Sequence, residues 1–181
     1  FNGVSADWKV AVPYYNTSPV DNGDGTITYD GHLVWEWWLD IPGGHPMTPL
    51  FDSDRYPDSP SGASFTTSLA NQATFSGVGF GGDESVSEYA GRINGILNAP
   101  ETGTYRFYLA SDDHGLLSIS TDADPANLVK VAEQTSCCND FTLADGGLSG
   151  TVDLVAGNQY YVEALQKEGG GGDWMTVAWR L

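Results

Sequence analysis

Short runs of alternating apolar residues, separated by glycine-rich and proline-rich turns, dominate the second half of this chain. An apolar residue stands at every second position in Tyr105, Phe107 and Leu109, as it does in the run that begins at Met175. This is the period of a strand with one buried face. No window carries a sustained apolar stripe at helical spacing. The pattern therefore predicts an all-β fold, an antiparallel β-sandwich with long loops.

The same pattern gives the expected elements. Strands are predicted at residues 32–39, 88–97, 104–110, 116–121, 128–132, 150–155, 159–166 and 174–181. Residues 40–85 are expected to form long loops packed on the core, and residues 124–127 a short turn of helix. Residues 1–30 are expected to be an irregular N-terminal segment, with a hairpin turn at residues 21–25. That turn resembles an EF-hand loop, but the ligand spacing fails.

Length and charge limit the organisation and the partners. A chain of 181 residues suits one domain, residues 1–181, with a full core. A formal net charge of −17 argues against nucleic acid and anionic membranes, because phosphate would repel the chain. No stretch approaches the length of a membrane-spanning helix, so no membrane insertion is expected. The start at Phe1, without a signal peptide, favours a domain of a larger protein.

Carboxylates cluster in two segments beside predicted strands. Asp112 and Asp113 follow one strand, and the four glycines before Asp173 precede another. Hard oxygen ligands on two loops suit one hard cation, and Ca²⁺ takes about six to eight oxygens. Successive side chains on an extended strand point to opposite faces, so a cis peptide would bring both adjacent carboxylates to one side. Backbone carbonyls of Gly170 and Gly172 are expected to add ligands.

A calcium ion in such a site would keep positions open to water, and neighbouring hydroxyls of a sugar would replace that water. Trp174 offers an apolar face to the sugar, while His114 and Gln134 can form hydrogen bonds. The alternative for Trp174 is a position in the core, because the alternation places Met175 and Trp179 on the opposite face.

The two cysteines, Cys137 and Cys138, are adjacent in the sequence. They cannot form a four-cysteine zinc site or a C-x-x-C redox pair. Two alternatives stay open: a pair of free thiols, or a vicinal disulfide that stiffens the turn, which an oxidising compartment would permit.

Five segments resemble, in order, the PA-fourteen (PA14) domain family, including its bacterial branch. They are YAGRING (89–95), APETGTYRF (99–107), SDDHG (111–115), STD with DPAN (120–127), and YYVEA leading into KEGGGGD (160–173). Together they cover roughly residues 33–181.

The resemblance implies a β-sandwich in an extracellular setting, in bacterial or fungal surface proteins or attached to glycosidases. In the family's lectins, adjacent aspartates joined by a cis peptide bind calcium, and sugar hydroxyls coordinate the ion. The resemblance places these aspartates at Asp112 and Asp113, the second calcium loop at residues 168–174, and the cysteine loop at the border of the site. The yeast flocculation lectins place an asparagine in the second loop. Here the third side-chain ligand stays open between Asp173, Glu168 and Gln166.

The sequence therefore predicts a calcium-dependent lectin domain of a bacterial surface adhesin, which binds cell-surface glycans or polysaccharides. The alternatives are an accessory carbohydrate-binding module of a secreted glycosidase, and a calcium-stiffened structural or protein-interaction domain. The predicted metal ligands are Asp112, Asp113, Gly170, Gly172 and Asp173; the predicted sugar contacts are Asp112, Asp113, His114, Gln134, Cys137, Cys138, Gln166 and Trp174. No catalysis is expected, since adjacent aspartates cannot stand the roughly 5–10 Å apart that glycoside hydrolysis needs.

Overall fold

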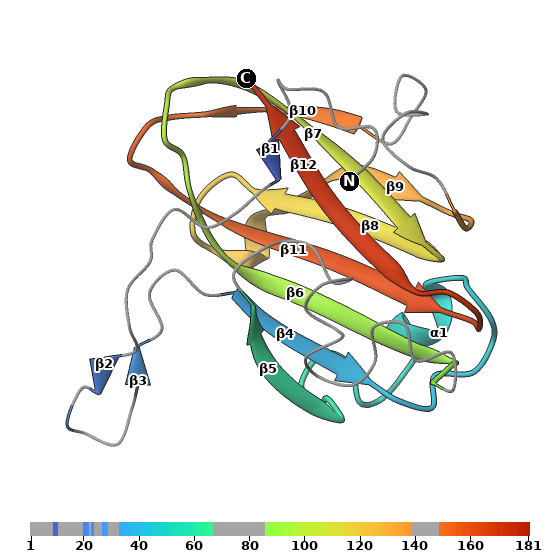
Figure 1. Cartoon of the computed structure of the whole chain (residues 1–181). Coiled ribbons are helices and arrows are strands. Elements are labelled where there is room, and N and C mark those ends of the chain that lie inside the picture. Colours follow the sequence, from blue (N-terminus) through green and yellow to red (C-terminus); the bar gives the residue numbers. More distant parts are fainter. Residues whose placement is uncertain are drawn as a thin grey trace.

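The computed structural model describes residues 9–10, 20–21, 23, 27–28, 33–66, 86–138 and 149–181 (Figure 1). Its elements are β1 (Lys9–Val10), β2 (Val20–Asp21), β3 (Ile27–Thr28), β4 (Leu33–Trp38), α1 (Thr48–Phe51), β5 (Gly62–Thr66), β6 (Tyr89–Asn98), β7 (Gly103–Asp112), β8 (His114–Ser120), η1 (Pro125–Asn127), β9 (Leu128–Gln134), β10 (Ser149–Leu154), β11 (Gln159–Glu168) and β12 (Trp174–Arg180). All eight predicted strands and the short turn of helix are present.

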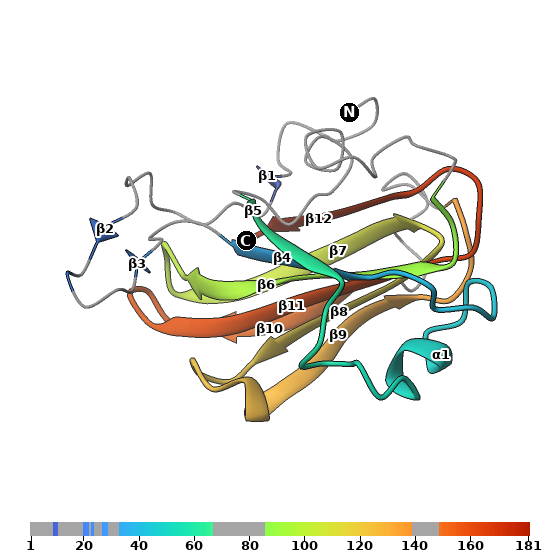
Figure 2. The same ribbon diagram turned by 90° about the horizontal axis from the view of Figure 1, so that it is seen from below.

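The strands form two main antiparallel sheets, which confirms the predicted all-β sandwich (Figures 1 and 2). One sheet has four strands in the order β1-β12-β7-β10, and the other has six in the order β5-β4-β6-β11-β8-β9. Alternate residues of both sheets enter one core, as the period of two predicts. That core joins Phe107 and Val177 of the four-stranded sheet to Trp35, Ile93 and Leu117 of the six-stranded sheet.

The second face of the six-stranded sheet carries its own apolar cluster. Ala90 and Leu165, which alternate with core residues, lie here with Trp38. The segment that follows β4 covers them and contributes Met47 and Leu50. This segment corrects the prediction of loops alone over residues 40–85, because it contains α1 and the strand β5. A four-residue helix and a five-residue edge strand are too short to show a clear period.

The N-terminal region is also more regular than predicted. β1 pairs with β12 and so extends the four-stranded sheet. β2 and β3 pair in antiparallel register, which confirms the hairpin predicted around residues 21–25. Residues 22 and 24–26 of that turn, and residues 67–85 of the predicted loops, lie outside the described residues.

Within the ranges given above, no helix combines the length and the apolar character that crossing a membrane requires.

Candidate metal and sugar site

Two connections cross between the sheets at the same end of the sandwich. β7 belongs to the four-stranded sheet and β8 to the six-stranded sheet, so the chain crosses at residues 112–114. β11 and β12 also lie in different sheets, so the glycine loop at residues 169–173 crosses as well. Trp174 pairs with Asp112, and Lys167 pairs with His114. The register therefore places the two crossings side by side, and this brings the predicted carboxylates together.

The first crossing carries the predicted cis peptide between Asp112 and Asp113. The backbone around it is held on several sides. Ser111 Oγ donates to the carbonyl of Asp113 at 2.9 Å, and Gln166 Nε2 donates to the carbonyl of Asp112 at 2.5 Å. The N–H of Gly169, in the second crossing, donates to Asp113 Oδ2 at 3.1 Å. The two loops are therefore bonded to each other at the aspartate pair.

Negative charge is poorly compensated at this point. Burial, followed by the charge of Asp113 and its contact with Asp112, raises the pKa of the Asp112 carboxyl above its ordinary value. The charge of Asp173 adds to the same effect. A raised carboxyl pKa means that the ionised form is disfavoured where it stands. A bound cation would reverse this, because it would favour the ionised form.

Glu168 is the most deeply buried of the carboxylates at this point. Its side chain is 0% exposed, and neither Oε atom has a hydrogen-bond partner. Burial, followed by the charge of Asp113, raises its pKa to about 7; the Gly170 N–H opposes this shift, and the charges of Asp173 and Asp112 add to it. A buried carboxylate without a donor is costly, and a metal ion is one of the few groups that can satisfy it.

Asp173 is buried as well, but its carboxylate has a partner. Tyr89 donates its hydroxyl to Asp173 Oδ2 at 2.6 Å. Burial, together with this hydrogen bond, raises the pKa of Tyr89, so the phenol stays protonated and remains a donor. The carboxylate oxygens of Asp112, Asp113 and Asp173 do not all lie within 4.8 Å of one another. Their carboxylates would therefore have to close further around an ion.

A buried lysine supplies part of the balancing charge. Lys167 is 0% exposed, and its Nζ donates to the carbonyl of Glu168 at 2.6 Å. Its Nζ also lies 3.4 Å from Glu88 Oε2. Burial lowers the pKa of Lys167, and the charges of Glu88, Glu168 and Asp113 oppose that shift. The ammonium group thus anchors the start of the glycine loop while it faces the carboxylates.

The glycines fit a crowded crossing. A Cβ on Gly169 would lie 3.1 Å from backbone atoms of Gly44 and His45, so the loop packs directly on the segment before α1. Gly171 has a φ of 110°, a region that favours glycine. A Cβ on Gly172 would lie 3.4 Å from Asp112 Oδ2. The second crossing therefore runs close against the first aspartate.

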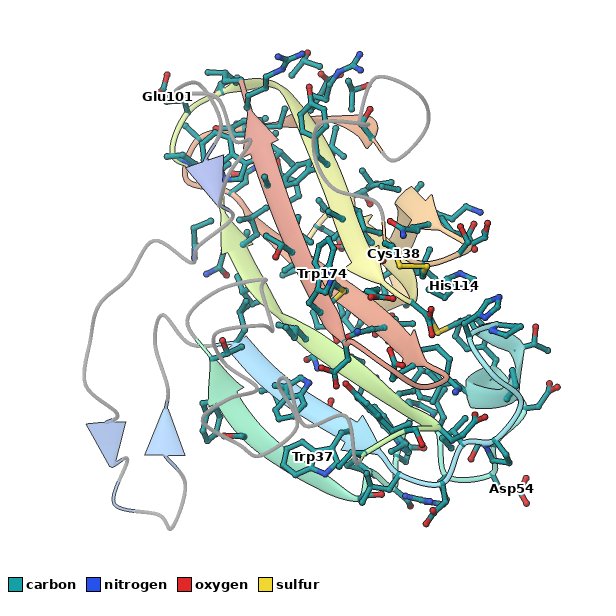
Figure 3. All side chains as sticks on the ribbon, turned by 45° about the vertical axis from the view of Figure 1, so that its right-hand side comes forward. Trp37, Asp54, Glu101, His114, Cys138 and Trp174 are labelled. Carbon is teal, nitrogen blue, oxygen red and sulfur yellow. A yellow bond between two sulfur atoms is a disulfide. The ribbon has the colours of Figure 1, made fainter. Side chains whose placement is uncertain are left out.

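Trp174 stands at the edge of this cluster and is half-buried. Met175 and Val177 enter the core and Trp179 packs against it, whereas Trp174 is not part of that core. Of the two alternatives left open by the sequence, the structure places Trp174 beside the site (Figure 3).

His114 and Gln134 lie beneath the surface. Gln134 is 1% exposed. Its Oε1 accepts a hydrogen bond from the N–H of Ser111 at 3.3 Å, and its Nε2 donates to the carbonyl of Ser111 at 2.7 Å. His114 Nε2 lies 3.2 Å from Glu133 Oε1, and its Nδ1 is buried without a partner. Gln134 thus holds the backbone of Ser111, next to Asp112, and the predicted contact of both residues with sugar stays a prediction. Gln166, 0% exposed, likewise holds the Asp112 carbonyl.

The two cysteines are joined as a vicinal disulfide, one of the two alternatives above (Figure 3). Both residues are exposed. The N–H of Cys138 donates to the carbonyl of Ser111 at 3.1 Å, which fixes the disulfide next to the aspartate pair.

Sequence reasoning missed the residues that support this site from beneath, namely Glu88, Tyr89 and Lys167. Lys167 carried a usable signal, because it directly precedes Glu168 and the glycine run. Tyr89 and Glu88 carried none, since they are about 80 residues distant in the chain. Tyr89 reaches the site through the pairing of β6 with β11, and Glu88 directly precedes it.

The sequence profile of the PA14 domain matches residues 48–181, somewhat less than the roughly 33–181 expected. Fibrocystin-L of Homo sapiens is 30% identical over 80 residues, which span 44% of this chain and only 2% of that protein.

Two solved structures share the fold at low sequence identity. A β-glucosidase from Kluyveromyces marxianus has a TM-score of 0.58 and 15% identity, over 93% of this chain and 19% of its own. The epithelial adhesin 9 A domain from Candida glabrata, solved in complex with Galb1-4GlcNAc, has a TM-score of 0.54 and 12% identity, over 82% of this chain and 80% of its own.

Fold and site together define an antiparallel β-sandwich whose carboxylates gather where two loops cross between the sheets. The chain belongs to the PA14 domain family. Its structural neighbours include a carbohydrate-binding adhesin domain and a glycosidase.

Proposed function

We propose that this domain binds carbohydrate through a calcium ion held between its two sheet crossings. The observation that carries the proposal is the set of four acidic side chains at that point, Asp112, Asp113, Glu168 and Asp173. One of them, Glu168, is fully buried and has no hydrogen-bond partner.

The donor set fits calcium. Every candidate side-chain ligand is a carboxylate, and calcium prefers hard oxygen ligands in a flexible arrangement. Asp112 and Asp113 would hold the ion from the first crossing. Asp173 and Glu168 would hold it from the second, together with carbonyls of Gly170 and Gly172. When bound, the ion would supply an electrophilic centre for a pair of neighbouring sugar hydroxyls.

The chain's own residues would orient the sugar. Trp174 is half-buried beside Asp112 and offers an apolar surface to the C–H groups of a sugar ring. The exposed disulfide offers a second rigid surface next to the same aspartate. Gln134 and Gln166 would act indirectly, because they hold the backbone of Ser111 and Asp112. His114, whose Nε2 lies against Glu133, would form a hydrogen bond with the sugar.

The proposed setting is the surface of a bacterial cell, where the domain would form part of a larger adhesin and bind glycans. The disulfide is compatible with an extracellular position. A net charge of −17 disfavours nucleic acid as a partner. We propose binding without catalysis, because the two aspartates of the first crossing are adjacent and bonded to the neighbouring loop.

An accessory module of a secreted glycosidase would use the same site. Such a module is expected to prefer a long polysaccharide over the terminal sugars of cell-surface glycans. A glycan array that includes soluble polysaccharides therefore separates the two settings.

The direct test is titration of the intact domain with monosaccharides that carry vicinal hydroxyls, in calcium and in excess chelator. A small ligand on one ion and a shallow rim is expected to bind with a dissociation constant near the millimolar range, about −4 kcal/mol. Asp113→Asn should abolish binding. Asp153→Asn, which makes the same charge change on β10 at the other end of the four-stranded sheet, should bind as the parent does. Sugar binding that survives the chelator would overturn the proposal.

A further inference from the structure

The disulfide lies close enough to the aspartate pair to share a metal ligand set with it. The two sulfur atoms of Cys137 and Cys138 and a carboxylate oxygen of Asp112 all lie within 4.8 Å of one another. Among the described residues, this is the only set of three histidine, cysteine or acidic side chains that is so compact. Both cysteines are exposed and Asp112 is half-buried, so solvent and small solutes reach the group.

As long as the sulfurs are bonded to each other, they cannot bind a metal, because the thiolate is the ligand. Reduction changes the donor set. Two thiolates and one carboxylate suit a thiophilic divalent cation of the zinc and cadmium class, whereas carboxylates alone suit calcium. The same end of the sandwich therefore contains donors for two kinds of metal, and Asp112 is common to both.

We propose that the reduced chain holds one thiophilic divalent cation between Cys137 Sγ, Cys138 Sγ and the Asp112 carboxylate. The separation of the donors fits. In a tetrahedral zinc site with bonds of about 2.0–2.3 Å, neighbouring ligand atoms stand about 3.5 Å apart. The three ligand atoms already lie within 4.8 Å of one another. Once the sulfur–sulfur bond is broken, the two sulfurs must move apart to reach this spacing, while the Asp112 carboxylate stays next to them. Three protein ligands leave the fourth position to water.

The loop is held in place by contacts that do not depend on the sulfur–sulfur bond. Cys138 N–H donates to the Ser111 carbonyl at 3.1 Å. Gln134 Nε2 donates to the same carbonyl at 2.7 Å and to the Ser136 carbonyl at 2.6 Å. Since Ser111 directly precedes Asp112, these hydrogen bonds keep the thiols next to the carboxylate after reduction.

The chemistry balances in two steps. A phosphine reductant supplies two electrons and the sulfur–sulfur bond breaks; one water gives its two protons to the sulfurs, which become thiols, and its oxygen to the phosphine, which becomes the phosphine oxide. The divalent cation then displaces both thiol protons and forms two metal–sulfur bonds. The carboxylate of Asp112 completes the set without proton transfer. This inference does not rest on calcium or sugar binding, although occupancy by the thiophilic ion would compete with calcium for Asp112.

The test uses the whole chain, reduced with a phosphine that is then removed under anaerobic conditions. Titration with Cd²⁺ alone is followed through the ultraviolet absorption of cadmium bound to thiolate. We expect the band to saturate at one equivalent in the reduced protein and to be absent from the oxidised protein. The double variant Cys137→Ser, Cys138→Ser should show no band after the same treatment.

Two further variants test the role of the aspartate. Asp112→Asn should retain the two thiolates but weaken Cd²⁺ binding by at least about tenfold, since a ligand is lost. Asp153→Asn removes the same charge at the other end of the sheet and should bind as the parent does. No band in the reduced parent, a stoichiometry other than one, or equal affinity in the Asp112→Asn and Asp153→Asn variants would overturn the proposal.

Discussion

The two ends of strand β8 carry aspartates in opposite electrostatic situations. Before β8, Asp112 stands beside Asp113 and near Asp173, and burial together with these charges raises its pKa. After β8, Asp122 accepts hydrogen bonds from Asn127 Nδ2 and from the N–H of Asp124. Those hydrogen bonds lower its pKa. Aspartate is thus poorly compensated before β8 and fully supplied with hydrogen-bond donors after β8.

The comparison separates a structural aspartate from a candidate ligand. The carboxylates of Asp122 and Asp124 find all these hydrogen-bond donors within six residues of the chain, because Asp124 Oδ1 also accepts from the Ala126 N–H and caps η1. The first end draws its acidic side chains from two crossings that are distant in the sequence but adjacent in space, and it supplies them with few donors. Local donors build a turn, whereas converging carboxylates with few donors are an arrangement that a bound cation would stabilise.

The largest expected effect is the loss of calcium binding in Asp113→Ala. Asp113 accepts from the Gly169 N–H and so joins the two crossings, and its removal takes away both a charged ligand and that link. Isothermal titration calorimetry should show calcium affinity reduced by at least about a hundredfold, or about 2.7 kcal/mol. If the variant binds calcium as tightly as the parent, the ion lies elsewhere and the first end of β8 is not a metal site.

An effect of similar size is expected in the pH dependence of stability without calcium. Glu168 is fully buried and its pKa is raised to about 7 from an ordinary value of 4.5. Between these two pKa values, the folded chain holds a proton on Glu168 that the unfolded chain has released. The free energy of unfolding should therefore fall as pH rises from about 4.5 to about 7, by up to about 3 kcal/mol. Urea denaturation at a series of pH values, in chelator, measures this slope.

Two controls sharpen the result. Glu168→Gln should remove the downward slope, because no proton is then exchanged at this position. Saturating calcium should also flatten it, since the ion would favour the ionised carboxylate. A parent protein whose stability rises over the same window would show that Glu168 is ionised without any cation.

Sequence alone was enough for most of the sandwich, because its core strands alternate strongly. Tyr105, Phe107 and Leu109 mark β7, and all eight predicted strands appear. Near the site, the predicted strands end two residues too early. β7 continues to Asp112 and β11 to Glu168, since backbone pairing extends through polar residues that an apolar pattern does not register. β5 and α1 were missed because each is short and takes its stability from packing on its neighbours.

For the candidate site, the residues themselves indicated the aspartate pair and the glycine loop, and both strand geometry and the family resemblance pointed to the cis peptide. It left the choice between Asp173, Glu168 and Gln166 open. The structure distinguishes them by their partners: Gln166 donates to backbone, Asp173 accepts from Tyr89, and Glu168 has neither. Such differences depend on β6, whose residues reach the site through long-range pairing, so no local pattern contains them.

Trp174→Ala should distinguish sugar binding from calcium binding at the end of β8 that carries Asp112. Its indole is half-buried beside Asp112 but supplies no carboxylate, so calcium affinity should stay within about twofold. Loss of one aromatic contact is worth about 1 kcal/mol, and sugar affinity should fall about fivefold. Parallel calorimetric titrations with calcium and with sugar measure both. Unchanged sugar affinity would remove Trp174 from the proposed rim.

The smallest effect is expected at the other end of β8, from Asp122→Asn. Asp122 is exposed, and its carboxylate accepts from Asn127 and Asp124, so the variant loses a local turn contact and nothing at the crossings. Calcium affinity should equal that of the parent. Because hydrogen bonds lower the pKa of Asp122, its stabilising contribution is present above the ordinary aspartate pKa and disappears as pH falls through the lowered value. Thermal melts should therefore show a slightly lower midpoint than the parent at neutral pH, and the difference should vanish in acid. This slope is opposite in sign to that of Glu168, which loses stability as pH rises. A fall in calcium affinity in Asp122→Asn comparable to that in Asp113→Ala would contradict the distinction between the two ends of β8.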